Sequence, residues 1–303
     1  MTQPTPYLVT IGTFDGVHRG HQKLMRWVRR LSRRLHMRTR VVFFASPPRF
    51  YFHPKFTHPL LTTSLQRRAI LKSLGMDRVE ILRFGPHWAR MPHERFFEEY
   101  LVRRWKAGGV LVGRDFAFGA GRKGDPAYLR RACGARGMRL GILPLVRVRG
   151  RKISSRDIRR LLDSGSVAEA GRLLGRPYTL TGRVVRGRGL GARLGFPTAN
   201  LRVSPELLAP PGVFHVRAEV PHAGTLDAVC SIGHRPTIGR GLKPTVEVHI
   251  PGWSGDLYGK VLRIEFLLRL RGERKFKSLE ALRRAIARDL RRVTGRKTPA
   301  HPA

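Results

Sequence analysis

The sequence predicts a protein of two domains: an α/β domain with a parallel sheet, then a smaller antiparallel β-domain that ends in a helix. Three observations support this prediction. The chain has 303 residues, about twice the usual length of one domain. Its first half alternates short apolar runs with amphipathic helical patterns, whereas its second half alternates apolar and polar residues one by one. We place the boundary near Arg172, which gives domains over residues 1–172 and 173–303.

The N-terminal half is predicted to consist of strands connected by helices. Five apolar runs are short and nearly continuous, as expected for strands covered on both faces: Tyr7–Ile11, Val41–Phe44, Val79–Leu82, Val110–Val112 and Leu140–Val146. Between them, apolar residues recur at helical spacing over 24–35 and again over 96–105. Gly108 and Gly109 are expected to end the later helix. Strand–helix alternation implies a parallel sheet with right-handed crossovers.

The C-terminal half changes to a period of two from about residue 178. Alternating runs predict strands over 214–220, 246–250 and 262–270, and the turn residues between them favour an antiparallel sheet or small barrel. Two short helices, over 154–162 and 167–174, are expected before this region, and the tail 296–303 is expected to fray. One helix closes the chain. Ser278 can cap it, and its buried stripe is expected at Leu279, Leu282, Ile286 and Leu290.

The composition excludes several classes of protein. Hydrophobic residues make up 41% of the chain, too many for a disordered protein, and no uncharged apolar run approaches the ~18 residues of a membrane span. Cys133 and Cys230 form neither a disulfide framework nor a four-ligand zinc site. The first residues carry no secretory or transit signal. We therefore expect a cytoplasmic protein with no membrane partner, and we expect a monomer or weak oligomer.

The net charge of +40 has two interpretations. One is an anionic partner, such as a nucleotide, RNA or a membrane surface. The other is compositional drift, because arginine is scattered through every segment and asparagine occurs once, at Asn200. The basic residues form no stripe interleaved with aromatic residues. We favour drift and expect no specific nucleic-acid partner.

The first candidate site is the segment Gly12–Gln22, which reads Gly-Thr-Phe-Asp-Gly-Val-His-Arg-Gly-His-Gln between the first strand and the first helix. Open parallel sheets bind ligands beyond the carboxyl ends of their strands, and glycines there let a backbone approach phosphate. His18 and His21 are three residues apart at a helix start, so both can face one point beside free N–H groups. This arrangement suits a polyphosphate. The alternatives are a capping cluster or zinc ligands, but no third ligand lies at a familiar spacing.

The second candidate site is the glycine-rich segment Gly187–Asn200, which ends in Pro-Thr-Ala-Asn. It lacks the Gly-Lys-[Ser/Thr] of a Walker loop and precedes no clear helix, so a flexible linker is the alternative. Thr198 and Asn200 offer hard oxygen donors on one side of an extended chain, which suits Mg²⁺. Glu247 lies between two valines and could face either the inner or the solvated side of its strand.

The Gly12–Gln22 segment resembles the signature of the FMN adenylyltransferase module of bacterial bifunctional riboflavin kinase/FAD synthetases, nucleotidyltransferases with a His-x-Gly-His motif. Leu61-Thr62-Thr63 and the run 112–119 resemble the same family. The resemblance implies a Rossmann-like nucleotidyltransferase domain. His18 and His21 would hold the ATP phosphates and stabilise the transition state while FMN attacks the α-phosphorus and pyrophosphate leaves. Further nucleotide contacts are implied for Gly12, Phe14, Asp15, Gly16, Asp115, Gly119, Ser154, Ser155 and Arg159.

Several segments of the second half together resemble riboflavin kinase: 197–200, 231–237, 247–249 and 256–260. The implied fold is a small antiparallel β-barrel with a C-terminal helix. Glu247 is implied as the base for the riboflavin 5′-hydroxyl, and Thr198 and Asn200 as ligands of Mg²⁺ and the ATP phosphates. A flap over the nucleotide is implied for the run that holds Gly189, Gly191 and Gly195, and a flavin contact is implied for Arg271.

These resemblances predict a bifunctional enzyme that phosphorylates riboflavin to FMN with Mg-ATP and then adenylylates FMN to FAD. One alternative keeps the kinase with a weak or inactive adenylyltransferase half, because Arg156 and Asp157 replace the Thr-Arg usual in the family's second phosphate loop. Another is a basic nucleic-acid-binding protein on a nucleotidyltransferase-like fold. A third, some other cytidylyl or adenylyl transfer, explains the His-x-Gly-His motif but not the second half.

Overall fold

The computed structural model describes residues 5–56, 58–143, 147–148, 151–187, 189–234 and 244–294. The chain divides into two compact units, Met1–Ser155 and Arg156–Ala303. This division precedes the expected boundary near Arg172, because helix α8 (Val167–Leu174) packs against β8 (Tyr178–Val185) and β13 (Val261–Arg271) of the second unit. The expectations for residues 144–146, 235–237 and 296–303 fall outside the described residues.

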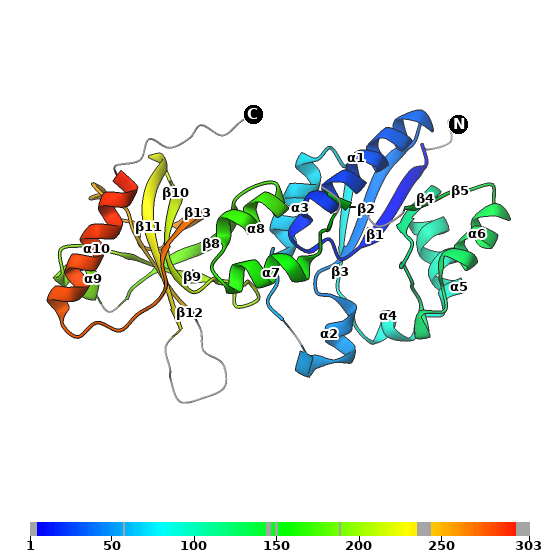
Figure 1. Ribbon diagram of the computed structural model, residues 1–303. Coiled ribbons are helices and arrows are strands. Elements are labelled where there is room, and N and C mark those ends of the chain that lie inside the picture. Colours follow the sequence, from blue (N-terminus) through cyan, green and yellow to red (C-terminus); the bar gives the residue numbers. More distant parts are fainter. Residues whose placement is uncertain are drawn as a thin grey trace. The chain divides into compact units, whose positions relative to one another are not determined.

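The N-terminal unit is built on a five-stranded sheet in the order β3-β2-β1-β4-β5 (Figure 1). All neighbouring strands are parallel, which confirms the predicted α/β class. Each predicted strand is present, with bounds that differ by a few residues: β1 Tyr7–Gly12, β2 Arg38–Phe44, β3 Arg78–Leu82, β4 Ala107–Gly113 and β5 Arg139–Leu143. A short hairpin follows, formed by β6 (Arg147–Val148) and β7 (Arg151–Lys152).

Helices cover both faces of this sheet. Successive side chains of each strand point to opposite faces, and the apolar side chains on both faces are buried by helices. On β1, Leu8 packs with α1 (Arg19–Arg34) and α3 (Ser64–Ser73), whereas Val9 packs with the π-helix η3 (Phe96–Arg104) and α6 (Pro126–Gly134). The remaining helices are short: η1 Asp15–Val17, α2 Pro48–Phe52, η2 Pro54–Phe56, α4 Pro86–Arg90, α5 His93–Arg95 and η4 Ala120–Arg122. Helix α7 (Ser155–Asp163) begins at the division between the units.

The expectation that Gly108 and Gly109 end a helix is wrong. Helix η3 ends earlier, at Arg104, and Lys106 turns the chain with a φ of 50°. Both glycines lie inside β4, where close packing requires them. A Cβ on Gly108 would lie 2.7 Å from the Pro6 side chain, and one on Gly109 would lie 3.0 Å from the carbonyl oxygen of Arg139.

The C-terminal unit is a closed barrel in the order β10-β11-β12-β9-β8-β13, with every pair antiparallel (Figure 1). Its other strands are β9 Ala199–Val203, β10 Gly212–Val220, β11 Gly224–His234 and β12 Pro244–His249. Two helices accompany them, α9 (Leu190–Arg193) and the C-terminal α10 (Leu279–Thr294). The predicted antiparallel barrel with a C-terminal helix is thus confirmed. The glycine-rich run contains one helical turn, α9, and is followed by strand β9, in line with the expectation that it precedes no clear helix.

The buried face of α10 differs from the predicted stripe. Ser278 caps the helix as expected, since its Oγ accepts a hydrogen bond from the amide of Ala281 at 3.1 Å. Leu279, however, is 61% exposed. The fully buried positions are Ala285, Asp289 and Val293, while Leu282 and Ile286 are only half-buried because they line a pocket.

Candidate active sites

The first candidate site is the turn between β1 and α1. At Gly12, a Cβ would come within 2.7 Å of the Phe14 ring, so glycine lets that ring fold back over the end of the strand. Phe14 and Val17 are buried and adopt left-handed backbone conformations, with φ of 47° and 40°. A β-branched residue such as Val17 is strained there, and such strain persists only where surrounding contacts fix the loop.

Asp15 provides several of those contacts. Its buried Oδ1 accepts hydrogen bonds from the amides of Leu61 at 3.0 Å and Thr62 at 3.3 Å. The same oxygen lies 3.6 Å from a guanidinium nitrogen of Arg67. The amide of Gly16, which has a φ of 78°, donates to Thr62 Oγ1 at 3.1 Å. The Asp15 carboxylate thus holds the turn against residues 61–62, and a direct nucleotide contact by Asp15 or Gly16 stays a prediction.

Arg67 is a residue of this site that the sequence analysis missed. Its side chain is fully buried and donates to the carbonyl oxygens of Thr13 at 2.8 Å, Phe44 at 3.1 Å and Thr62 at 3.2 Å. It thereby ties together the ends of β1 and β2 and the start of α3. Its position beside the capping box of α3 gives no sequence signal of burial, because the first turn of a helix is commonly exposed.

His18 and His21 stack at the start of α1, with ring centroids 3.7 Å apart and planes 16° from parallel. The spacing therefore brings the two rings together, and their common contact with a phosphate stays a prediction. The amide of His21 donates to Nδ1 of His18 at 3.4 Å, so His18 caps the helix and carries its proton on Nε2 when neutral. The buried Nδ1 of His21 has no hydrogen-bond partner among the described residues. Burial first, and then the charges of His18 and Arg67, hold the pKa of His21 well below its ordinary value.

The second predicted phosphate loop lies against this turn. Ser155 begins α7, and its Oγ donates to the carbonyl oxygen of Asp15 at 2.9 Å. Ser154 precedes it, and Arg159 lies one turn further along the helix, half-buried. The substituted residues differ in exposure, since Arg156 is exposed and Asp157 is half-buried. The structure therefore brings Ser154 and Ser155 to the turn that holds the stacked histidines.

Asp115 and Gly119 follow β4, which is the neighbour of β1 in the sheet. Asp115 is exposed in the turn after the strand, at the same carboxyl edge as the histidine turn. Gly119 has a φ of 74°, and a Cβ there would lie 2.6 Å from the backbone of His93. Close packing against His93 accounts for this glycine, and its contact with a nucleotide stays a prediction.

The second candidate site is a row of side chains across the barrel. Strand register places Glu247 of β12 between Asn200 of β9 and Ser231 of β11. Ser231 in turn pairs with Val213 of β10, which pairs with Arg271 of β13. One row thus runs across five strands on the side opposite the barrel interior, and all five residues line one pocket.

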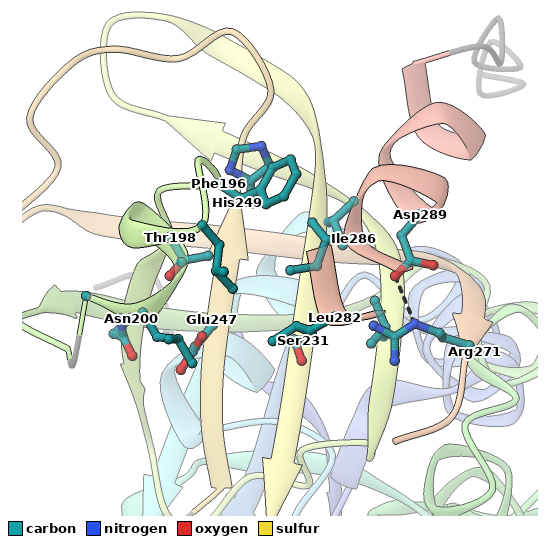
Figure 2. Close-up of a pocket in the computed structure, with 16 residues that line it drawn as sticks. Phe196, Thr198, Asn200, Ser231, Glu247, His249, Arg271, Leu282, Ile286 and Asp289 are labelled. Atoms are coloured by element: carbon teal, nitrogen blue, oxygen red, sulfur yellow. Dashed lines mark hydrogen bonds and ion pairs between the residues drawn. The ribbon is translucent and has the colours of Figure 1, made fainter. Parts of the chain in front are cut away.

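Helices α9 and α10 complete this pocket. Leu282, Ile286 and Asp289 reach it from α10, and Leu190 and Gly191 reach it from α9. Figure 2 shows Thr198, Asn200 and Glu247 at one end, Arg271 with Asp289 at the other, and Ser231 between them. The pocket therefore has an oxygen-rich end and an end that combines apolar side chains of α10 with one guanidinium group.

Glycines shape the run that borders the oxygen-rich end. Gly189 and Gly195 adopt left-handed conformations, with φ of 70° and 87°. A Cβ on Gly191 would lie 2.5 Å from the carbonyl oxygen of Phe196, and one on Gly187 would lie 2.1 Å from the amide of Asn200. Gly189 and Gly191 line the pocket, and Gly195 is not among its described lining residues. Residues 189–198 of the run therefore form a folded turn rather than a flexible linker.

The orientation of Glu247 is resolved by its neighbours. Val246 and Val248 are each 1% exposed and fill the barrel interior, so Glu247 points the other way, into the pocket. Its carboxylate forms no hydrogen bond or ion pair with the part of the chain that the structure describes. Two residues along β12, His249 Nδ1 donates to the carbonyl oxygen of Pro197 at 2.7 Å and fixes the approach to Thr198. A carboxylate with this freedom can accept a proton from a hydroxyl bound in the pocket.

Arg271 and Asp289 form the ion pair of the other end, with Nε and Oδ2 2.9 Å apart. Asp289 is 4% exposed. Arg271 was predicted from the sequence and Asp289 was not, although an acid three residues after Ile286 on the buried face of a helix is a detectable signal.

Thr198 and Asn200 both line the pocket, and their binding of a divalent cation stays a prediction. Thr198 directly precedes β9 and Asn200 lies on it, where strand register pairs it with Glu247; all three residues line the pocket. The described residues contain no group of three or more His, Cys, Asp or Glu side chains that could hold a metal alone. A cation here would therefore depend on hydroxyl and amide oxygens and on oxygens of the substrate, as is common for Mg²⁺.

In the part of the chain that the structure covers, no helix has the length and apolar character needed to span a membrane.

Two family models together match most of the chain. The FAD synthetase model matches residues 1–157, and the riboflavin kinase model matches residues 174–295. These ranges correspond to the unit with the stacked histidines and to the barrel.

Known proteins resemble the chain over nearly its whole length. Bifunctional riboflavin kinase/FMN adenylyltransferase of Escherichia coli strain K12 is 34% identical over 93% of this chain and 90% of that protein. The protein of the same name from Pseudomonas fluorescens is 35% identical over the same shares. A crystal structure titled as a macrolide-efflux protein from Streptococcus pneumoniae has a TM-score of 0.86 and 29% identity, covering 98% of this chain and 96% of that one. The chain therefore belongs to the family of bifunctional riboflavin kinase/FMN adenylyltransferases.

Proposed function

We propose that this protein makes both flavin cofactors: its barrel phosphorylates riboflavin to FMN, and its α/β unit adenylylates FMN to FAD. The observation that supports this most strongly is that two separately folded units each present a different site. One unit offers paired imidazoles at a helix start, and the other offers a carboxylate beside hydroxyl and amide oxygens.

In the kinase reaction, the 5′-hydroxyl oxygen of riboflavin attacks the γ-phosphorus of ATP. The bond between that phosphorus and the β,γ-bridging oxygen breaks, and ADP leaves. We assign Glu247 as the base that takes the hydroxyl proton, because its carboxylate faces the pocket without a described partner. The apolar face of α10 and Arg271 suit the flavin ring, so we place riboflavin at that end and the ATP phosphates at the glycine turn.

Thr198 and Asn200 would hold Mg²⁺ together with phosphate oxygens. The donors fit this ion, because both are hard oxygen ligands and lie beside Glu247 in the pocket. When bound, Mg²⁺ neutralises charge on the phosphates. The chain's own contribution is to orient these oxygens, and the hydrogen bond from His249 to Pro197 supports that orientation.

In the adenylyltransferase reaction, a phosphate oxygen of FMN attacks the α-phosphorus of ATP and pyrophosphate leaves. We assign His18 and His21 to the phosphates of ATP, because their stacked rings lie at the start of α1, where free amides also favour anions. Burial keeps the His21 pKa low without ligand, and an adjacent phosphate would raise that pKa and favour the imidazolium. The pair can thereby gain positive charge where negative charge accumulates.

The test is a time course with purified protein, riboflavin, ATP and Mg²⁺, in which riboflavin, FMN and FAD are separated. We expect FMN to form first and FAD to follow. A parallel reaction that starts from FMN isolates the second step. FMN formation with no FAD in either reaction would reduce the function to the kinase and would implicate Arg156 and Asp157. Unchanged riboflavin would contradict the whole proposal.

A further inference from the structure

Asp289 is a buried acid on a mostly basic helix. Five arginines of α10 are exposed, Arg283, Arg284, Arg288, Arg291 and Arg292. Its own side chain is 5% exposed and lies beneath the helix, against β13. An exposed acid on this helix could pair with any of several surface arginines. Asp289 instead pairs with Arg271, which lines the pocket.

The contacts of Arg271 leave one part of its guanidinium available. Nε donates to Asp289 Oδ2 at 2.9 Å, and Nη1 donates to the carbonyl oxygen of Gly272 at 3.3 Å. The Phe276 ring lies 5.4 Å from the guanidinium carbon. Among the described residues, no group accepts a hydrogen bond from Nη2. Because a guanidinium is planar, fixing Nε and Nη1 also fixes the direction of Nη2.

We propose that Asp289 is a positioning residue for riboflavin: it fixes Arg271 so that Nη2 donates to an acceptor atom of the flavin ring. Figure 2 shows the dashed ion pair between Arg271 and Asp289, and Asp289 lies on the same helix as Leu282 and Ile286, which line the pocket. The ion pair thus fixes the Arg271 guanidinium relative to α10, the helix that also provides the apolar side chains of the pocket. This inference rests on the proposed kinase function of the barrel.

The alternative is that the pair only anchors α10 to the barrel. That alternative predicts lower stability when Asp289 is changed, with no selective effect on one substrate. The positioning role predicts a selective effect, because Arg271 lies at the opposite end of the pocket from Thr198, Asn200 and Glu247. Riboflavin binding should weaken, and ATP binding should stay unchanged.

The experiment measures kinase KM values for riboflavin and ATP, riboflavin binding by fluorescence quenching, and thermal unfolding in full-length variants. We expect Asp289→Ala to raise the riboflavin KM and Kd about tenfold or more, the effect of one charge-assisted hydrogen bond, with the ATP KM within about twofold. Asp289→Asn keeps an acceptor oxygen for Nε and should restore riboflavin binding to within about threefold of wild type. The matched control is Glu265→Ala, which breaks the pairs of Glu265 with Arg217 at 2.9 Å and with Arg263 at 2.8 Å on the same barrel, outside the pocket lining.

A double-mutant cycle with Arg271→Ala separates the two roles. If Asp289 acts through Arg271, adding Asp289→Ala to Arg271→Ala should raise the riboflavin KM by less than about twofold more. Full additivity, equal changes in both KM values, or failure of the Asn variant to rescue would each overturn the positioning role. If Asp289→Ala does not fold, the Asn variant and the Arg271 variant still decide between the roles. Wild-type protein that leaves riboflavin unphosphorylated would contradict the kinase function instead, and the binding measurement would then test the positioning role alone.

Discussion

Replacement of Glu247 by glutamine tests the kinase site most directly, because the structure predicts little effect other than on chemistry. The side chain faces the pocket, and its carboxylate has no described hydrogen bond or ion pair to lose. Glutamine has nearly the same volume and fits between Asn200 and Ser231. We therefore expect the free energy of unfolding to change by no more than about 0.5 kcal/mol.

The expected loss is in kcat. A positioned general base contributes about 10² to 10⁴ in rate, which corresponds to about 2.7 to 5.4 kcal/mol of activation free energy. The lower part of this range is expected if phosphoryl transfer is loose, because the hydroxyl proton then moves late. The riboflavin KM should stay within about threefold of wild type, because we place the flavin ring at the other end of the pocket.

The assay follows FMN formation from riboflavin and ATP, with FAD formation from FMN as an internal control for folding. Glu219→Gln is the matched control, since Glu219 is an exposed carboxylate on β10 of the same barrel. A kcat within about threefold of wild type in Glu247→Gln would remove Glu247 as the base. Equal losses in both reactions would indicate misfolding rather than lost chemistry.

Four further predictions concern the histidine turn, its buried Arg67 and the glycine turn of the barrel. His21→Ala should slow FAD formation about a hundredfold and spare FMN formation, and equal losses in both would argue against separate sites. Because burial lowers the pKa of His21, the unfolded chain binds a proton that the folded chain does not. The free energy of unfolding should therefore fall as the pH drops below about 6.5, less steeply in His21→Gln, as urea titrations at several pH values would reveal. Arg67→Leu should cost about 3–5 kcal/mol of stability in such titrations, since it removes one partner of the buried pair with Asp15, and a loss below about 1 kcal/mol would contradict this. Gly191→Ala should lower kinase turnover about tenfold or more and leave adenylyl transfer unchanged, because its Cβ would lie 2.5 Å from the Phe196 carbonyl oxygen.

Features that depend on a local sequence pattern, such as strands and turns, were predicted. Features that depend on residues far apart in the sequence, such as strand register, were not. The strand runs and the glycine-rich turns are local, and each predicted strand was found. The direction of the Glu247 side chain was ambiguous in the sequence, because an alternating strand has two faces and the pattern does not say which one is buried. The closed barrel, with α10 over one side, shows that Glu247 faces the pocket. The row from Asn200 to Arg271 requires strand register between segments far apart in sequence, which no short pattern contains.

Helix ends and buried charges were the other sources of error. Two glycines after a helical pattern normally indicate a helix end, but Gly108 and Gly109 serve close packing within a strand. Leu279 fits the helical stripe by spacing, yet the first turn of α10 extends beyond the surface it covers, so this leucine is exposed. Arg67 is buried because three carbonyl oxygens converge on it, and their convergence exists only in the folded chain.

The distribution of buried charge explains how a chain of net charge +40 keeps two defined sites. The chain has 20 acidic residues, and in the described part only Asp15 and Asp289 are buried. Each pairs with an arginine at a candidate site: Asp15 with Arg67 at the turn of the stacked histidines, and Asp289 with Arg271 at the end of the pocket where we place the flavin. Stability alone does not account for such pairs, because apolar residues of similar volume often serve equally well. We infer that these two pairs fix the direction of the histidine turn and of the Arg271 guanidinium, while the excess arginine accumulates on the surface.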